Sequence, residues 1–236
     1  MINNTNDIFN SEFSRNYDAY NGRLGEIGDN LHLLISLLLN DLPQQANILC
    51  VGVGTGTEIL RLAQRHPEWR FTGVDPSPDM LAVCAEKLEK AGISSRCQLV
   101  EGRLDRLPVS GDFDAALCLL VAHFILDAER YGLYDQMASQ LRTGGRLVVA
   151  EIAGEIDSPA FDEHMAIWAR MHEVAGQGTR DPAEMKAQLA ERLLLLAPEH
   201  TEALIARSGF TPPLRFFQSL LIHGWSACKI APAAGV

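Results

Sequence analysis

The sequence lacks the basic clusters that nucleic-acid-binding proteins carry. Its 236 residues include 20 lysines and arginines against 30 aspartates and glutamates, which gives a formal net charge of −10. No run of five or more basic side chains occurs. Binding to nucleic acid relies largely on neutralising phosphates with such clusters. The composition therefore argues against an RNA or DNA partner.

Long apolar runs, a leader and paired cysteines are also missing. The most apolar early stretch, LHLLISLLLNDL, is 12 residues long and too short for a bilayer. The N-terminal MINNTNDIFNSEF has neither the basic nor the apolar region of a signal peptide. The five cysteines form no CxxC pair and lie mostly in apolar runs, as reduced thiols of cytosolic proteins do. We expect a cytoplasmic protein without a membrane segment.

The sequence also lacks the spacing of a metal site. No cluster of histidines and carboxylates is arranged as metal ligands usually are, and HEVAG has one histidine where HExxH needs two. We therefore predict no catalytic metal.

What the sequence does contain is an alternation of strand-like and helix-like segments. Apolar residues at helical spacing predict a helix over 27–41, and Ser77 and Pro78 have the residue types of an N-cap and a first helical residue. Strands alternating with helices, with nearly continuous apolar runs in the strands, imply a parallel sheet covered on both faces. The predicted strands are NILCVG, RFTGVD, RCQLVEG, FDAALCLL and GGRLVVAEI, and the helices between them are 57–67, 78–91 and 128–142.

After about residue 158 the pattern becomes mainly helical. Asp181, Pro182 and Glu184 predict the start of one helix. The predicted helices are FDEHMAIWARMHEVAG, DPAEMKAQLAERLLLLAP and EHTEALIARSGF, followed by one or two strands in LRFFQSLLIHGWSACKI. We interpret the chain as one domain of four parts: an N-terminal helical lid (1–43), a cofactor-binding core (44–152), a helical cap (153–210) and terminal strands (211–232).

The stretch ILCVGVGTGTEIL places three glycines directly after the first strand of the core. A phosphate loop, GxxxxGK[ST], is excluded because Glu58 follows Thr57 and no lysine lies nearby in the sequence. The dinucleotide pattern GxGxxG also fails, because its third glycine would fall at Thr57. The spacing is GxGxG instead.

An acidic residue, Asp75, ends the second predicted strand. An acid at this position can accept hydrogen bonds from the ribose hydroxyls of adenosine, in a dinucleotide or in S-adenosylmethionine (SAM). The glycine loop and this acid together predict an adenosine-containing ligand beyond the carboxyl ends of the strands.

Five ordered motifs resemble those of class I SAM-dependent methyltransferases: LCVGVGTG, FTGVDPSPDML, LVEGRLDRLP, FDAALCLL and LRTGGRLVVAEI. They cover about residues 46–152, and the terminal SGFTPPLRFFQSLLIHGWSACK is similar to the final hairpin of that fold. Within the superfamily the likeness is closest to the carboxy-SAM synthase branch and its small-molecule relatives. The resemblance implies an α/β, Rossmann-like, doubly wound and mostly parallel seven-stranded sheet, with SAM as cofactor and S-adenosylhomocysteine as product.

The resemblance also implies which residues hold the cofactor. The matching positions are Gly52, Gly54, Thr55 and Gly56 for its amino-acid end, Asp75 for the ribose, Pro76, Met80, Arg103 and Leu104 for the adenine, and Leu119 for the methionine portion near the transferring carbon.

Three positions depart from the pattern of the family. The acid usual two residues before the first glycine is Cys50 here, so another residue orients the methionine portion or the affinity is lower. Gly102-Arg103 stands where the family often has Gly-Asp, so the adenine amino group needs another acceptor. The arginine that grips the extra carboxylate of carboxy-SAM falls at Leu189, which favours plain SAM.

The sequence thus favours a methyltransferase that acts on a small molecule, with a homodimer left open. His123, just after the fourth strand, is the candidate general base, and His164, His172 and His223 are further candidates. Three alternatives stay open: a carboxy-SAM synthase-like enzyme or cyclase, a non-catalytic SAM-binding protein, and an NAD-dependent oxidoreductase, which Thr57 disfavours.

Overall fold

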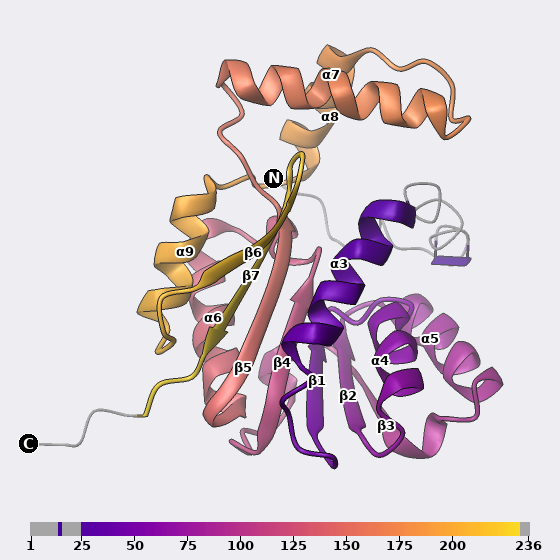
Figure 1. The fold of residues 1–236 in the computed structure, drawn as a ribbon, viewed down its shortest axis with the longest axis vertical. Coiled ribbons are helices and arrows are strands. Elements are labelled where there is room, and N and C mark those ends of the chain that lie inside the picture. The colour runs from indigo at the N-terminus through magenta and orange to yellow at the C-terminus, as the bar shows by residue number, and fades with distance from the viewer. Residues whose placement is uncertain (1–13, 16–24, 232–236) are drawn as a thin grey trace, which may run out of the picture.

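The computed structural model describes residues 14–15 and 25–231. In this part of the chain seven strands form one sheet in the order β3-β2-β1-β4-β5-β7-β6 (Figure 1). β7 runs antiparallel to β5 and β6, and the other pairings are parallel, which confirms the predicted mostly parallel sheet. The strands are β1 (Asn47–Val51), β2 (Arg70–Asp75), β3 (Cys97–Glu101), β4 (Phe113–Leu119), β5 (Leu141–Ile152), β6 (Leu214–Ser219) and β7 (Ile222–Cys228).

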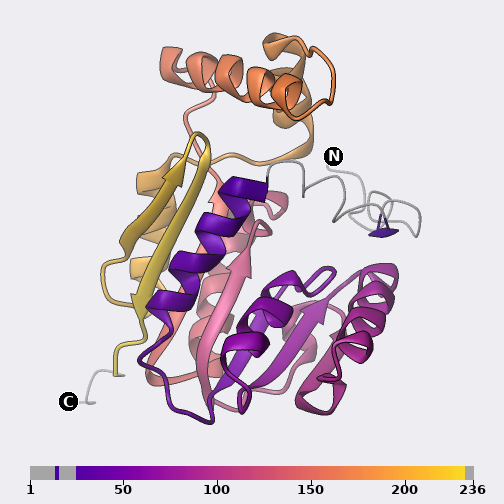
Figure 2. The same cartoon turned by 45° about the vertical axis from the view of Figure 1, so that its right-hand side comes forward.

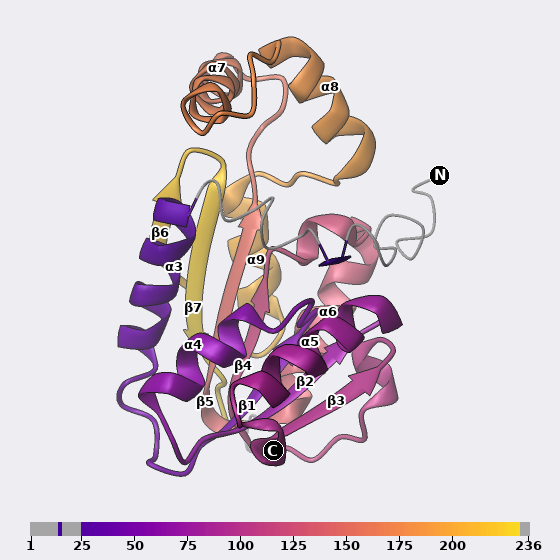
Figure 3. The ribbon, with the colours of Figure 1, turned by 90° about the vertical axis from the view of Figure 1, so that its right-hand side faces the viewer.

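Helices cover both faces of the sheet (Figure 3). α3, α4 and α5 pack on one face, and α6 and α9 pack on the other. The described α-helices of more than one turn are α3 (Gly25–Leu38), α4 (Thr57–Arg65), α5 (Pro78–Lys90), α6 (Asp127–Gln140), α7 (Pro159–Val174), α8 (Pro182–Arg192) and α9 (Pro198–Arg207).

The central strands read as continuous apolar runs because both of their faces are buried. Successive side chains of a strand point to opposite faces. In β1, Ile48 and Cys50 join the core beneath α4 and α5, whereas Leu49 and Val51 join the core beneath α6. This burial fixes the register of the strand, so the glycine loop that follows leaves the sheet at a defined position.

The helix starts predicted from residue type are confirmed at two places. The Ser77 hydroxyl accepts from the backbone N–H of Met80 at 3.3 Å, at the start of α5. The Asp181 carboxylate accepts from the backbone N–H groups of Ala183 and Glu184, at the start of α8. Each cap satisfies amides that the helix itself leaves without a partner.

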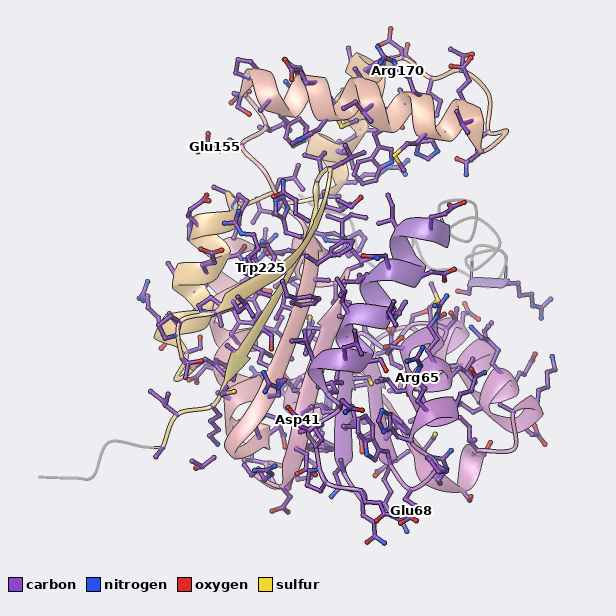
Figure 4. All side chains as sticks on the ribbon, in the orientation of Figure 1. Asp41, Arg65, Glu68, Glu155, Arg170 and Trp225 are labelled. Atoms are coloured by element: carbon purple, nitrogen blue, oxygen red, sulfur yellow. The ribbon has the colours of Figure 1, made fainter. Side chains whose placement is uncertain are left out.

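α7 and α8 form a separate layer above the carboxyl ends of the strands (Figures 1 and 2). Phe161, Met165 and Met185 form the centre of this layer, and Leu221 from the β6–β7 turn packs against them. Figure 4 shows Glu155 on the connection from β5 and Arg170 on the side of α7 that faces away from the sheet. The layer therefore contacts the rest of the fold through the β6–β7 turn and its two connections.

The prediction that a helix continues through the leucine run after Arg192 is wrong. Leu193 has an extended backbone, and 193–197 forms no helix. The N–H of Leu194 donates to the carbonyl of His123, and the carbonyl of Leu196 accepts from Gly154. Residues 193–197 therefore form hydrogen bonds to the loops after β4 and β5 in place of the bonds of a helix. No local sequence pattern indicates these distant partners.

About half of the N-terminal lid predicted over 1–43 lies outside the described residues, and from Gly25 the chain forms α3. Among the helices that the structure describes, none has the length and apolar character needed to cross a membrane.

Candidate active site

The glycine loop lies at the carboxyl end of β1, between that strand and α4. The N–H groups of Gly52 and Val53 both donate to the carbonyl of Val74, at 2.8 and 3.1 Å, which ties the loop to β2. Gly52, Gly54 and Gly56 have φ angles of 67°, 51° and 77°. This left-handed region is open to glycine at little cost and is unfavourable for other L-residues.

The three glycines have different surroundings. A Cβ on Gly52 would lie 2.4 Å from Val121 Cγ2, and a Cβ on Gly56 would lie 2.5 Å from Cys84 Sγ. A Cβ on Gly54 would meet only the carbonyl oxygen of Gly52, at 4.0 Å. Gly52 and Gly56 are therefore needed for packing within the protein, while Gly54 leaves room for another molecule to approach the backbone.

We expect alanine substitutions at Gly52 and Gly54 to differ in their cost to stability. Gly54→Ala should cost about 1–2 kcal/mol of unfolding free energy, the strain of a left-handed non-glycine residue. Gly52→Ala should cost more, because its Cβ also collides with Val121, and Val121→Ala in the same chain should recover part of that loss. Urea denaturation of the three variants measures this. Equal losses of unfolding free energy for Gly52→Ala and Gly54→Ala would contradict the packing role of Gly52 against Val121.

Asp75 closes the site from β2, the strand next to β1. Its carboxylate is buried and accepts from the N–H of Gly54 at 2.8 Å and from the N–H of Ser77 at 2.9 Å. Burial raises the pKa of Asp75, and these two backbone hydrogen bonds oppose the rise. Since a carboxylate has about four acceptor positions, the side chain keeps the capacity to accept further donors.

The other predicted cofactor residues lie along the same edge of the sheet. The N–H of Gly102 donates to the Asp75 carbonyl at 2.9 Å, which brings the loop after β3 next to the loop after β2. Leu104 is buried, whereas the Arg103 side chain is exposed and pairs with Glu129 at 3.5 Å. The sequence did not indicate this ion pair, which links the loop after β3 to α6. Of the remaining positions, Met80 is buried, Pro76 is exposed, and Thr55 is buried within the glycine loop.

The turn after β4 is held in an unusual conformation. Leu119 ends the strand, and Leu120 has a φ of 59°, which is strained for a leucine. The N–H of Leu120 donates to the carbonyl of Ala150 at 2.6 Å, and the next side chain, Val121, packs against Gly52. Backbone strain of this kind clusters at functional sites. Here the hydrogen bond to Ala150 and the packing of Val121 hold the strained turn between the glycine loop and the end of β5.

His123 follows this turn and is buried. Its Nδ1 accepts from the N–H of Ile152 at 3.2 Å, which leaves the ring proton on Nε2, and its carbonyl accepts from Leu194. Burial, and then the charge of Arg130, lower the pKa of His123 to about 3. These contacts join the loop after β4 to β5 and to the 193–197 segment. The catalytic role suggested by the sequence stays a prediction.

We expect His123 to remain neutral well below pH 6. Its pKa is about 3 in the folded chain against 6.5 for an ordinary histidine. The unfolded chain therefore binds more protons between these values, and His123 lowers the free energy of unfolding as the pH falls from 6.5 towards 3. NMR titration of the ring signals, assigned with His123→Gln, tests this. A His123 signal that titrates near pH 6.5 would contradict it.

Two groups of residues at this edge escaped the sequence analysis because their members are far apart in the chain. Lys87 of α5 donates to the hydroxyls of Thr55 and Thr57, at 3.2 and 3.5 Å, so a lysine does lie beside the glycine loop. Arg130 and Glu151 form an ion pair in which both side chains are 0% exposed. Neither pairing has a signal in the local sequence.

Arg130 joins three parts of the fold near the site. Its Nε donates to the carbonyl of Ile125 at 2.9 Å, Nη1 donates to Glu151 Oε2 at 3.2 Å, and Nη2 donates to the carbonyl of Leu194. The other oxygen of Glu151 accepts from the hydroxyl of Thr201 at 2.5 Å. The network connects α6, β5 and α9 with the 193–197 segment that leads from the cap.

The described residues form no second site of this kind. No group of three or more histidines, cysteines and acids there is placed to hold a metal ion. A hollow of about 360 Å³ lies at the opposite edge of the sheet, where its lining includes Arg70, Arg96 and Asp112. Because open parallel sheets bind ligands at their carboxyl ends, we assign no function to it.

Comparisons with known proteins agree with this geometry. Residues 48–145 match the family described as a methyltransferase domain. The chain is 22% identical over 230 residues to the carboxy-S-adenosyl-L-methionine synthase of Salmonella newport, covering 97% of this chain and 90% of the relative. It is 25% identical over 171 residues to a polyketide synthase of Burkholderia thailandensis, covering 70% of this chain and 8% of that protein. The chain thus spans a small part of this second relative.

A solved structure shows the same fold. The structure of a proposed O-methyltransferase from Nostoc punctiforme PCC 73102 superposes with a TM-score of 0.67 at 18% identity, covering 93% of this chain and 59% of that chain. Together with the strand order, this shows a Rossmann-like methyltransferase fold, and the domain matched over residues 48–145 is consistent with a class I SAM-dependent methyltransferase. SAM is the cofactor that this domain implies.

The residues at the site fit this cofactor. Gly54 leaves its backbone approachable, and Asp75 keeps acceptor capacity for the ribose hydroxyls. Both lie near the point where the strand order reverses between β1 and β4, which is where doubly wound sheets bind nucleotides.

Proposed function

We propose that this protein transfers the methyl group of SAM to a small-molecule acceptor and releases S-adenosylhomocysteine. One observation carries the proposal: the Gly54 N–H donates to the Asp75 carboxylate, which joins the glycine loop to the acid at the end of β2. This pairing stands at the switch point of a sheet with the class I strand order.

The proposed cofactor residues are those that the resemblance implies, and each has a stated part. The glycine loop approaches the amino-acid end, Asp75 accepts from the ribose hydroxyls, and Met80 and Leu104 border the adenine. The full set is Gly52, Gly54, Thr55, Gly56, Asp75, Pro76, Met80, Arg103, Leu104 and Leu119.

SAM, when bound, supplies an activated methyl group on a sulfonium, so the protein mainly has to align acceptor and methyl. We propose that the 119–125 loop and the 193–197 segment form one wall of the acceptor site and that α7 and α8 cover it. Leu194, Leu195 and Leu196 on that segment are partly buried and suit a partly apolar acceptor. The acidic net charge and the likeness to an O-methyltransferase support a small molecule rather than a nucleic acid.

We also propose that the protein works in the cytoplasm. All five cysteines are free thiols, and Cys50, Cys84 and Cys118 are buried. Unpaired cysteines are typical of reducing compartments. A homodimer remains a prediction that sedimentation or scattering would test.

The experiment is a calorimetric titration with S-adenosylhomocysteine and, in parallel, with NAD. We expect S-adenosylhomocysteine to bind and NAD not to bind. A screen of phenols, carboxylic acids and amines for release of S-adenosylhomocysteine from SAM then identifies the acceptor class. Binding of NAD without binding of S-adenosylhomocysteine would refute the proposal.

A further inference from the structure

The imidazole of His123 is held in one tautomer by the backbone. Its Nδ1 accepts from the N–H of Ile152 at 3.2 Å, and its own carbonyl accepts from the N–H of Leu194 at 2.8 Å. A backbone N–H can only donate, so Nδ1 carries the lone pair and Nε2 carries the proton. His123 is therefore a fixed N–H donor between the end of β5 and the 193–197 segment.

The Nε2–H group of His123 forms no hydrogen bond to another described residue. His123 is 3% exposed, yet Nε2 is not enclosed. In the part of the chain that the structure describes, the enclosed side-chain nitrogens and oxygens without a partner are Tyr134 Oη and Gln177 Nε2. Nε2 of His123 therefore reaches the protein surface although almost all of the residue is covered. A donor in such a position suits a partner that comes from outside the protein.

The loop that carries His123 contacts the parts of the fold proposed to meet SAM and its acceptor. Val121, two residues earlier, is the side chain that a Cβ on Gly52 would meet, so the loop lies against the glycine loop. The bond from Leu194 ties the same loop to the segment that leads from the cap. The free N–H thus lies just beyond the carboxyl end of β4, at the edge of the sheet where the proposed cofactor residues lie.

The surroundings of His123 make it a donor and not a base. Burial, and then the charge of Arg130, lower the pKa of His123 to about 3, so the ring is neutral at physiological pH. Arg130 is itself paired with Glu151. Accepting a proton requires an available lone pair, but that of Nδ1 is used by Ile152 and the protonated Nε2 has none. The ring can donate to a bound molecule and cannot deprotonate it.

We propose that His123 binds the methyl acceptor by donating a hydrogen bond from Nε2, and that the acceptor is a small molecule whose reacting oxygen is an anion, as in a carboxylate or an acidic phenol. This inference rests on the proposed function and deepens it, because it names the class of acceptor. It gives His123 the part of a substrate-binding donor in place of that of a general base.

An anionic acceptor removes the need for a base. A lone pair of its oxygen forms the bond to the methyl carbon, while the bond from that carbon to the sulfur of SAM breaks and its electron pair stays on sulfur. No proton moves in this step. A hydrogen bond to the charged form of an acid also favours that form, so Nε2–H promotes ionisation of a bound carboxylic acid or acidic phenol.

The affinity for oxyanions tests the donor role. Wild type, His123→Gln and His123→Phe, each saturated with S-adenosylhomocysteine, are titrated with benzoate, with para-nitrophenolate and with aniline, a neutral amine. Phenylalanine keeps a ring without an N–H, whereas glutamine keeps an N–H and is not a base. His123→Phe should weaken both oxyanions about tenfold or more, and His123→Gln should stay within about threefold of wild type. Aniline should bind more weakly than the oxyanions and alike in all three proteins.

NMR of wild type checks the tautomer without any variant. Long-range proton–nitrogen spectra should show Nε2 as a protonated nitrogen and Nδ1 as an unprotonated one, and benzoate should shift the Nε2 signal. His66→Gln is the matched control for the titrations, since His66 is a partly buried histidine at the far end of α4, stacked on Trp69. It should leave all affinities unchanged.

Several results would overturn the inference and leave the proposed function standing. They are an Nδ1–H tautomer, no shift of the Nε2 signal with either oxyanion, oxyanion affinities that do not differ between folded His123→Gln and His123→Phe, and tighter binding of aniline than of the oxyanions. If folded wild type does not bind S-adenosylhomocysteine, the proposed function itself fails, and the inference fails with it.

Discussion

Asp75→Ala is expected to lower the affinity for S-adenosylhomocysteine by about a hundredfold or more. The substitution removes the acceptor proposed for the ribose hydroxyls and also leaves the N–H groups of Gly54 and Ser77 without their carboxylate. Hydrogen bonds to charged groups contribute about 1.5–3 kcal/mol each, and 1.4 kcal/mol corresponds to tenfold in affinity. Calorimetric titration of wild type and variant measures the loss.

Asp114→Ala is the control for this experiment. Asp114 is also a buried acid that accepts from a backbone N–H, that of Asn47, but it lies at the other end of the sheet, in β4. The control is expected to lose stability and to keep its affinity for S-adenosylhomocysteine. An Asp75→Ala protein that is folded and binds S-adenosylhomocysteine as wild type does would remove Asp75 from the site.

Arg130→Met is expected to lower the free energy of unfolding by about 3–5 kcal/mol, the usual cost of removing one partner from a buried ion pair. Glu151 would then be a buried carboxylate that keeps only the hydroxyl of Thr201. The carbonyls of Ile125 and Leu194 would also lose their donor. Urea denaturation monitored by circular dichroism measures the change.

The double variant Arg130→Met/Glu151→Leu distinguishes the effect of lost packing from the cost of leaving the buried Glu151 carboxylate without a cationic partner. We expect it to be more stable than Arg130→Met alone, because a well-packed apolar pair can replace a buried ion pair at little cost. A double variant that is less stable than Arg130→Met would show that the charge of Glu151 is not the cause of the loss.

The pH dependence of Arg130→Met gives a second check. Burial already raises the pKa of Glu151 in wild type, and Arg130 opposes that rise, so the variant should have a higher pKa still. A folded-state pKa above the unfolded value of 4.5 means that the folded chain binds more protons. The stability of the variant relative to wild type should therefore fall as the pH rises from the raised pKa of Glu151 in wild type towards its higher pKa in the variant. A pH-independent difference would contradict this.

The alternation of strands and helices could be predicted because burial on both faces leaves a strong local signal. In β1, apolar side chains face opposite cores, and the polar residues Ser77 and Asp181 mark helix starts by their own hydrogen bonds. The glycine loop and Asp75 could also be predicted, because each is recognised from a short stretch of the sequence. The leucine run after Arg192 misled the analysis, because helix propensity lost to bonds formed with distant loops.

By itself, the amino-acid sequence determined the class of fold, the position of the ligand loop and the acid beside it. Those features follow from burial periodicity, from the φ angles that glycine allows and from caps within a few residues. Only the tertiary structure decided the partners of the buried charges. Arg130 meets Glu151 and Leu194 because the sheet order brings these segments together. A charged side chain carries no mark of its partner in the sequence, whereas in a folded core it must have one.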